Sequence, residues 1–189
     1  MIEWLFVPAA YLIGSISSAI IICRLMGLPD PREQGSGNPG ATNVMRIGGK
    51  KAAAITLFGD LLKGLLPVYV AKVLDVPVEL LVLTGIAAFM GHLYPIFFKF
   101  EGGKGVATSI GVLLGFSWAL GGAFVGTWLL IYKLGKISSL SALCASVLSP
   151  IYAWFILGDI WIVGASVFMM VLLLWRHKSN IQRLIKGEE

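Results

Sequence analysis

The sequence predicts an all-α integral membrane protein with about seven transmembrane helices, one of them short. The first observation is composition: 57% of the 189 residues are hydrophobic, 13% are charged and the mean hydropathy is +0.86. These values lie far outside the range of soluble domains. The second is that apolar runs long enough to cross a bilayer alternate with short polar stretches. The third is the net charge of +5, whose basic residues are scattered in short loops beside the apolar runs. That scatter argues against a nucleic-acid interface and indicates membrane topology.

The first apolar run predicts a helix over residues 4–25. We expect it to be retained and not a signal peptide, because the run is too long, only Glu3 precedes it as a charge, and no small-residue cleavage site follows. Gly14 and Ser18 lie four residues apart and form a small-residue face that lets another helix approach closely. Cys23 and Cys144 lack metal-type spacing and are expected to be simple packing residues.

The second helix is predicted over 52–74 and the third over about 78–98. Asp60 and Lys63 are three residues apart on the second helix, so they share one face and are expected to pair inside the bundle. The rule for charges within a membrane makes them functional candidates, although a purely structural pair is an equal alternative. His92, near the end of the third helix, is expected either to be a buried structural histidine or to have a functional role.

Residues 105–133 are too long for one crossing and too short for two ordinary ones. Two crossings, with a break near 117–122, place every Lys and Arg except Lys63 and Lys72 on one side. The positive-inside rule then predicts an external N-terminus and a cytoplasmic C-terminus. The cost is a fourth helix of about 12 residues, about 18 Å long against a core of about 30 Å, which must be buried in the bundle.

Two further helices, about 137–157 and 160–175, complete the predicted fold. The whole chain, residues 1–189, is then a single polytopic membrane domain. Its predicted cytoplasmic parts are the loops 27–51, 99–104 and 133–137 and the tail 176–189.

The longest polar stretch is GSGNPGATNVMR at 35–46. Its G-x-G-x-x-G spacing matches a dinucleotide fingerprint, but we reject that interpretation because no βαβ unit surrounds it. The density of glycine, amide and hydroxyl residues, with one arginine, instead favours a phosphate site. An ordinary cytoplasmic loop remains the alternative.

Local rules predict a helix start inside this stretch. We expect Asn38 to be the N-cap and Pro39 the first helical residue, which leaves the amides of the next residues free for an anion. On such a helix Thr42 and Asn43 lie four and three residues before Arg46, so their polar ends are expected to converge.

The second polar stretch, EGGKG at 101–105, leads into the short fourth helix. Bare glycine amides, a helix N-terminus and Lys104 coincide there, which again favours phosphate binding. It is not a Walker loop, because Gly105 stands where Ser or Thr would bind magnesium. A glycine-loosened turn with an interfacial lysine is the alternative.

The third stretch is RHKSN at 176–180. Basic residues after a last span are ordinarily topology anchors, and only His177 adds an acid or base that titrates near neutral pH. The chain has no His-x4-Asp dyad, no G-x-S-x-G elbow and no paired-aspartate cluster. No metal and no cofactor are predicted.

With these stretches in view, the chain resembles the bacterial acyl-phosphate glycerol-3-phosphate acyltransferase family, the membrane enzymes known as PlsY. The resemblance covers nearly the whole chain. It is carried by GSGNPGATNVMR at 35–46, GDLLKG at 59–64, GHLYPIFFKFEGGKGVATS at 91–109, ISSL at 137–140 and RHKSNIQRL at 176–184.

The resemblance implies transfer of a fatty acyl group from acyl phosphate to the 1-hydroxyl of glycerol 3-phosphate, at the cytoplasmic face of the bacterial inner membrane. The partners are then these two substrates and membrane lipid. It implies catalytic roles for Ser36, Arg46, Lys104, His177 and Asn180. The substrate-binding residues expected beside them are Gly35, Gly37, Asn38, Gly40, Thr42, Asn43, Gly102, Gly103, Gly105 and Ser139.

Three points stay open at this level. Glu101 stands where similar proteins often have a basic residue, and an acid there would weaken anion binding. The hydroxyl proton could pass to His177 or to the departing phosphate; we favour the phosphate, because nearby charges leave the protonation of the histidine insecure. The alternative function is a small transporter or flippase for a phosphorylated solute, since half-helix N-termini and an intramembrane ion pair also suit transport.

Overall fold

The computed structural model describes residues 2–189, and within that range the chain is entirely helical apart from loops and turns. The predicted all-α class is confirmed. Short 3-10 turns lie at Ile2–Leu5 and Ile96–Phe98. The helices in chain order are α1 (Phe6–Gly14), α2 (Ser18–Leu25), α3 (Ala41–Val73), α4 (Val78–Leu93), α5 (Val106–Phe116), α6 (Trp118–Gly135), α7 (Ser138–Leu157), α8 (Ile160–Arg176) and α9 (Lys178–Lys186).

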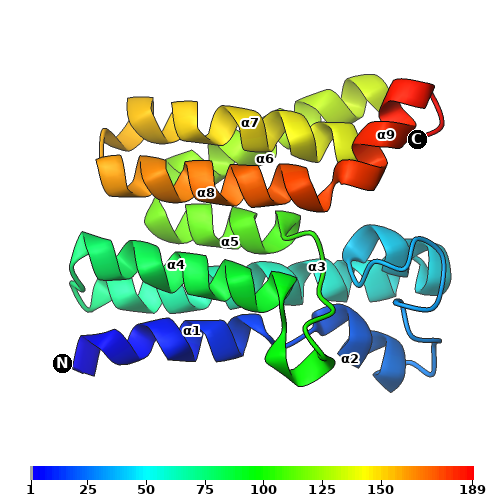
Figure 1. The fold of residues 1–189 in the computed structure, drawn as a ribbon, viewed down its shortest axis with the longest axis horizontal. Helices are drawn as coiled ribbons and strands as arrows, with labels where there is room; N and C mark the ends of the chain where they lie inside the picture. Colours follow the sequence, from blue (N-terminus) through cyan, green and yellow to red (C-terminus); the bar gives the residue numbers. More distant parts are fainter. Residues whose placement is uncertain (1) are drawn as a thin grey trace.

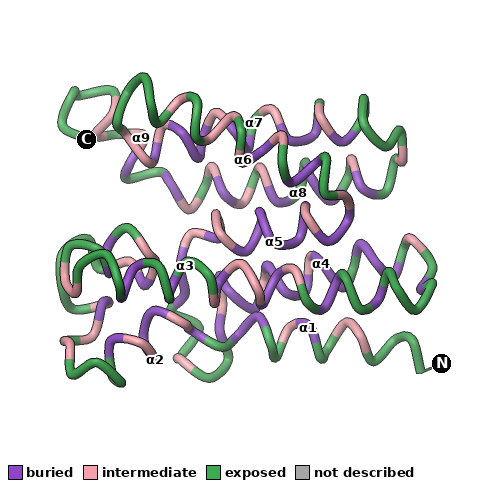
Figure 2. The backbone as a smooth tube through the Cα atoms, turned by 180° about the vertical axis from the view of Figure 1, so that it is seen from behind, coloured by how far each residue is buried: buried purple, intermediate pink, exposed green. Residues whose placement is uncertain are grey.

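The helices form two groups with α5 between them (Figure 1). One group contains α1, α3 and α4, and the other contains α6, α7 and α8. No residue of α5 is exposed, whereas the outer helices carry exposed residues along their lengths (Figure 2). The expectation of a short, buried fourth helix is therefore confirmed, with the break at Ser117, whose hydroxyl accepts the Leu120 amide at the start of α6.

Glycines let α5 lie directly against α3. A Cβ on Gly111 would be 2.1 Å from the carbonyl oxygen of Leu61, and one on Gly64 would be 2.3 Å from that of Thr108. Real Cβ atoms do not come so close, so neither position tolerates a side chain without a shift of backbone. This close backbone contact is typical of helices packed within membranes.

The first predicted helix is wrong in one respect, because it is broken. α1 ends at Gly14, α2 begins at Ser18, and the two are bent by 41°. The Ser17 hydroxyl caps α2 by accepting the Ile20 amide. The expected close approach at Gly14 is confirmed, since a Cβ there would be 2.2 Å from the Ala88 carbonyl oxygen on α4.

The predicted loop 27–51 also differs from the structure, because α3 already begins at Ala41. Its N-cap is Gly40, whose own amide bonds to the Asn38 carbonyl, so the expected cap at Asn38 is wrong by two residues. Gly49 has φ 74° and ψ −171°, which divides α3 into a short first helix, 41–48, and a long one, 50–73. Glycine adopts this positive φ at little cost.

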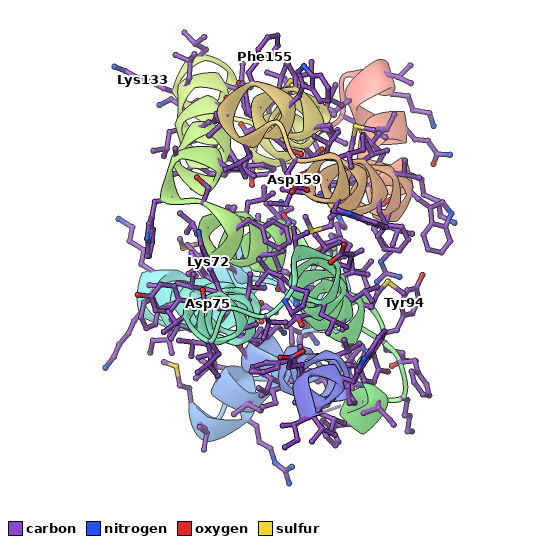
Figure 3. The ribbon with its side chains drawn as sticks, turned by 90° about the vertical axis from the view of Figure 1, so that its left-hand side faces the viewer. Lys72, Asp75, Tyr94, Lys133, Phe155 and Asp159 are labelled. Carbon is purple, nitrogen blue, oxygen red and sulfur yellow. The ribbon has the colours of Figure 1, made fainter. Side chains whose placement is uncertain are left out.

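Three helical segments are long and apolar enough to cross a membrane alone: α3, α4 with its following turn, and α7. Two bent pairs, α1 with α2 and α8 with α9, raise this to as many as five, and α5 is a shorter apolar helix. The count of seven crossings stays a prediction. Figure 3 views the bundle from the end where α3 meets α4 and labels Lys72, Asp75 and Asp159.

Candidate active site

The three polar stretches meet at one end of the bundle, where the loop before α3, the loop before α5 and α9 lie (Figure 1). A Cβ on Gly103 would be 3.1 Å from the carbonyl oxygen of Pro39, so the first and second stretches touch. Arg176 donates from its guanidinium to the carbonyls of Gly102, at 2.6 Å, and Gly103, at 3.2 Å. The third stretch is thereby fixed to the second.

The loop before α5 is packed so tightly that only glycine fits. Gly102 and Gly103 are buried against the last turn of α4, where their Cβ atoms would meet the carbonyl and ring of His92 at 2.1 and 2.3 Å. Gly105 has φ 92°, which also requires glycine. The amide of Gly103 bonds to the His92 carbonyl, so not every amide in the loop is bare as expected. Within residues 2–189, the amides of Lys104 and Gly105 donate to no other group.

Lys104 is half-buried and donates a hydrogen bond to the side-chain oxygen of Asn180. Burial, together with the nearby cations Arg183, Arg176 and Arg46, lowers the pKa of Lys104 to about 8. The ammonium is therefore charged at neutral pH, but burial and the nearby cations make this charge energetically costly. A bound anion would relieve that cost, as expected of a phosphate site.

His177 lies at the junction of α8 and α9 and is only 4% exposed. Its Nδ1 lies 2.8 Å from the Leu173 carbonyl oxygen, so Nδ1 carries the proton and Nε2 is left as an acceptor. Burial lowers the pKa of His177 to about 4, although this hydrogen bond acts in the opposite direction. Burial and the nearby cations Lys104 and Arg176 both favour the neutral side chain in the substrate-free protein. The expectation of an insecure protonation state, which concerned the site with its dianionic substrates bound, stays a prediction.

Two residues that sequence reasoning missed, Arg183 and Glu189, complete this side of the site. The Glu189 carboxylate accepts from Asn180 and from Arg183, each at 2.6 Å. Burial opposes its ionisation, but these hydrogen bonds outweigh burial and lower the pKa of Glu189 to about 2. The hydroxyl of Ser139, at the start of α7, is buried close to this carboxylate without a well-formed bond to any described residue. Nothing in the spacing of Glu189 marks it, because it lies three residues after the end of α9, beyond Gly187 and Glu188.

In the first stretch, Thr42 and Arg46 are both exposed on the short first part of α3, one helical turn apart as predicted. Arg46 forms no ion pair with any residue in 2–189, so its guanidinium is available. Ser36 is exposed between Gly35 and Gly37, whose positive φ angles of 60° and 67° make the turn that presents it.

Asn43 does not converge with Arg46, contrary to expectation, because it points into the preceding loop. Its side-chain amide donates to the carbonyls of Pro31 and Gln34, and its oxygen accepts the amide of Ser36. All three bonds serve the shape of the loop, which places Ser36. Asn38 and Gly40 lie together before the helix, where a Cβ on Gly40 would be 2.8 Å from the Asn38 side chain.

The acid in the second stretch, Glu101, pairs with an arginine of the first loop. Glu101 is exposed and accepts from Arg32 at 3.2 Å, and Arg32 also binds Asp30 at 2.7 Å. The negative charge of Glu101 is therefore balanced by a cation of the first loop. The weakening of anion binding expected from Glu101 stays a prediction.

No group of three or more His, Cys, Asp or Glu side chains in the described part of the chain could hold a metal ion. An apolar hollow of about 380 Å³ lies on α7 and is lined by Leu143, Cys144, Val147 and Leu148. It begins about one helical turn beyond Ser139, on the same helix.

Residues 4–187 match the family model for glycerol-3-phosphate acyltransferase. A glycerol-3-phosphate acyltransferase of Methylococcus capsulatus is 57% identical over 188 residues, which cover 100% of this chain and 95% of the relative. One of Thioalkalivibrio sulfidiphilus is 55% identical over 183 residues, covering 97% of this chain and 90% of the relative.

Two solved structures are also similar. Crystal structures of PlsY, an integral membrane glycerol 3-phosphate acyltransferase, superpose with a TM-score of 0.95 for the glycerol 3-phosphate form and 0.93 for the lysophosphatidic acid form. The sequence identities are 36% and 35%, and each match covers 100% of this chain and 94% of the other.

Proposed function

The chain belongs to the glycerol-3-phosphate acyltransferase family, and we propose that it transfers a fatty acyl group from acyl phosphate to the 1-hydroxyl of glycerol 3-phosphate. The products are lysophosphatidic acid and inorganic phosphate. The observation that supports this most directly is the convergence of three polar stretches around Lys104, where free amides, half-buried cations and an oriented histidine lie close together. The glycerol 3-phosphate and lysophosphatidic acid forms of the similar structures agree with this choice of acceptor and product.

Acyl phosphate is already activated, so the protein needs no covalent intermediate. Its task is to hold two dianions together and to place the acceptor hydroxyl about 3 to 3.5 Å from the acyl carbonyl. Lys104 and Arg46 supply positive charge, and the amides of Lys104 and Gly105 supply fixed donors at the start of α5. The turn at Gly35 and Gly37 exposes the hydroxyl of Ser36, which is the hydrogen-bond donor of the first loop that we assign to the oxyanion.

In the reaction, the glycerol oxygen forms a bond to the carbonyl carbon, and the bond from that carbon to the phosphate oxygen breaks. The hydroxyl proton must leave as this happens. With a pKa of about 4, His177 is a weaker base than a phosphate whose second pKa is about 6. We assign the proton to the departing phosphate, and to His177 Nε2 the role of accepting a hydrogen bond that orients glycerol 3-phosphate.

The acyl chain has a candidate site in the apolar hollow on α7. It begins near Ser139, at the end of the bundle where the polar groups gather, and its lining is wholly apolar. The exposed apolar residues on the outer helices suit a membrane environment, and the positions of the basic residues support our assignment of the site to the cytoplasmic face of the inner membrane.

The test is to incubate purified protein in detergent with acyl phosphate and glycerol 3-phosphate, and to measure phosphate release together with lysophosphatidic acid. We expect both products in equal amounts, and neither when glycerol 3-phosphate is omitted. A sample without protein measures the spontaneous hydrolysis of acyl phosphate, which is subtracted from every value. Uptake of glycerol 3-phosphate into vesicles without product formation would support the transporter alternative and overturn the proposal.

A further inference from the structure

The bundle contains a buried charge cluster that the reaction above does not use. Lys63 Nζ lies 2.9 Å from Asp60 Oδ1 on α3, which confirms the predicted pair, and His92 Nδ1 on α4 lies 3.7 Å from the same oxygen. The three residues are 2%, 6% and 6% exposed for Asp60, Lys63 and His92. Burying charges is expensive, and an apolar replacement of the pair is often at least as stable. Stability alone therefore does not explain why these charged groups are buried together.

Lys63 connects the cluster to the broken first helix. Its ammonium donates to the Ile16 carbonyl at 2.8 Å, in the break between α1 and α2. A helix end leaves carbonyls without intrahelical partners, and inside the bundle no water is at hand to satisfy them. The lysine therefore fixes the position of this break relative to α3.

Asp60 connects the cluster to the short helix. Its backbone carbonyl accepts the Thr108 hydroxyl at 3.0 Å, and Thr108 lies three residues after Gly105. The first turn of α5 is thus held to the same turn of α3 that carries the ion pair.

His92 connects the cluster to the glycine-rich loop in two ways. Its carbonyl accepts the amide of Gly103 at 3.2 Å, and its ring Nε2 occupies the space that a Cβ on Gly103 would fill, 2.3 Å away. The opposite ring nitrogen faces Asp60. The imidazole therefore lies between the carboxylate and the residue that precedes Lys104.

We propose that Asp60, Lys63 and His92 are positioning residues that hold the glycine-rich loop, and through it the Lys104 ammonium and amide, in the geometry that binds substrate phosphate. The inference rests on the proposed function, because the loop's ligand is taken to be a phosphate of one of the two substrates. The ion pair fixes the carboxylate, whose Oδ1 faces the imidazole Nδ1 across 3.7 Å without a hydrogen bond, and the imidazole packs against Gly103. An apolar cluster of the same volume would fill this space without orienting the ring.

The test uses the charge-neutral double variant Asp60→Asn/Lys63→Met, which removes the pair without leaving a single buried charge, and His92→Ala, which keeps the pair and removes the ring. The matched control is Thr84→Val on α4. Thr84 is fully buried and its hydroxyl bonds only to Leu80 within its own helix, so this change removes buried polarity away from the loop. For each protein, KM is measured separately for glycerol 3-phosphate and acyl phosphate, with kcat and the thermal unfolding temperature.

We expect KM for one of these substrates to rise about 10- to 100-fold in both test variants, because small displacements of binding groups have effects of that size. The control should change KM less than about twofold. The same changes are then made in Lys104→Ala, where their effect on KM should shrink, since the group they position is gone.

Wild-type protein without acyl transfer would refute the proposed function itself. Active wild-type protein, with test variants that behave like Thr84→Val, would overturn only the positioning role. Effects of unchanged size in the Lys104→Ala background would overturn it too. If one test variant does not fold, the other supplies the same comparison.

Discussion

The side-chain ammonium of Lys104 is hydrogen-bonded to the side-chain oxygen of Asn180, a residue 76 positions further along the chain. This contact joins the glycine-rich loop to α9 without any substrate. Asn180 is held in turn by the Glu189 carboxylate. The Lys104 ammonium therefore has a fixed hydrogen-bond partner when no anion is bound. A phosphate that binds Lys104 must therefore compete with one neutral acceptor, which a dianion does readily.

The lowered pKa of Lys104 predicts an alkaline limb in substrate binding. A lysine whose pKa lies near 8 carries its charge below that pH and loses it as the pH rises through 8. KM for the phosphate that it binds should therefore rise between pH 7.5 and 9.5, while kcat at saturation changes less, because bound phosphate stabilises the ammonium. Lys104→Arg, which stays charged throughout this range, should show no such limb. An identical limb in that variant would assign it to another group.

Removal of the Glu189 charge should move the same limb to lower pH. The Glu189 carboxylate raises the pKa of Lys104, so Glu189→Gln should lower it and make binding weaken earlier as the pH rises. KM should also rise at pH 7, since Asn180 and Arg183 lose a carboxylate partner. Glu188→Gln is the matched control, because Glu188 is exposed and its side chain contacts none of these groups. Equal behaviour of the two variants would remove Glu189 from the site.

Arg46→Lys should raise KM for one of the two substrates at least about tenfold, or roughly 1.4 kcal/mol of binding free energy. An ammonium keeps the charge but cannot reproduce the paired donors of a guanidinium on phosphate. Arg24→Lys provides the comparison, because Arg24 is exposed at the end of α2 and makes no ion pair within residues 2–189. Near-wild-type KM values in Arg46→Lys would exclude a bidentate contact.

The seven-crossing topology predicts which residues face the cytoplasm. Single cysteines at the exposed positions Gln34, Lys99, Gly135 and Ser179, in a background of Cys23→Ala/Cys144→Ala, should react with an impermeant thiol reagent only after the cytoplasmic side is opened. A cysteine at Asp75 should react in intact cells. Labelling of position 135 or 179 from outside would mean that α5 and α6 do not both cross.

The sequence predicted the short α5 well because charge placement decided it: a single crossing over 105–133 would have put several basic residues on the wrong side. It did not predict the break at Ser15–Ser17. Hydropathy runs continuously through Ile16, and the carbonyl of that residue is bonded by Lys63, 47 positions away. Local rules also misplaced the start of α3, since the side chain of Asn43 reaches back into the loop and fixes Ser36. Polar contacts between residues far apart in the sequence leave no periodic pattern from which they could be predicted.

The same distinction holds within the site. Lys104, His177 and Arg46 belong to polar motifs that stand out in an apolar chain, so their types and spacing were informative. Glu189 and Arg183 have no such context, and their role follows only from the fold of α9 over the start of α7. The burial of His177, which lowers its pKa, likewise cannot be read from the sequence around it.

The final prediction separates the two possible proton acceptors. If the departing phosphate takes the hydroxyl proton, the acidic limb of the kcat profile should lie near pH 6, the second pKa of a phosphate, and should persist in His177→Asn. The rate in that variant should still fall, because orientation of glycerol 3-phosphate is lost. If His177 is the base, the acidic limb follows its own ionisation in the substrate complex and disappears in His177→Asn, with a rate loss of about 10² to 10⁴. Both profiles are measured at saturating substrate, and Ser179→Asn, an exposed neighbour on α9, controls for disturbance of that helix. An acidic limb that vanishes with the histidine, at unchanged affinity for glycerol 3-phosphate, would make His177 the base and contradict the assignment to phosphate.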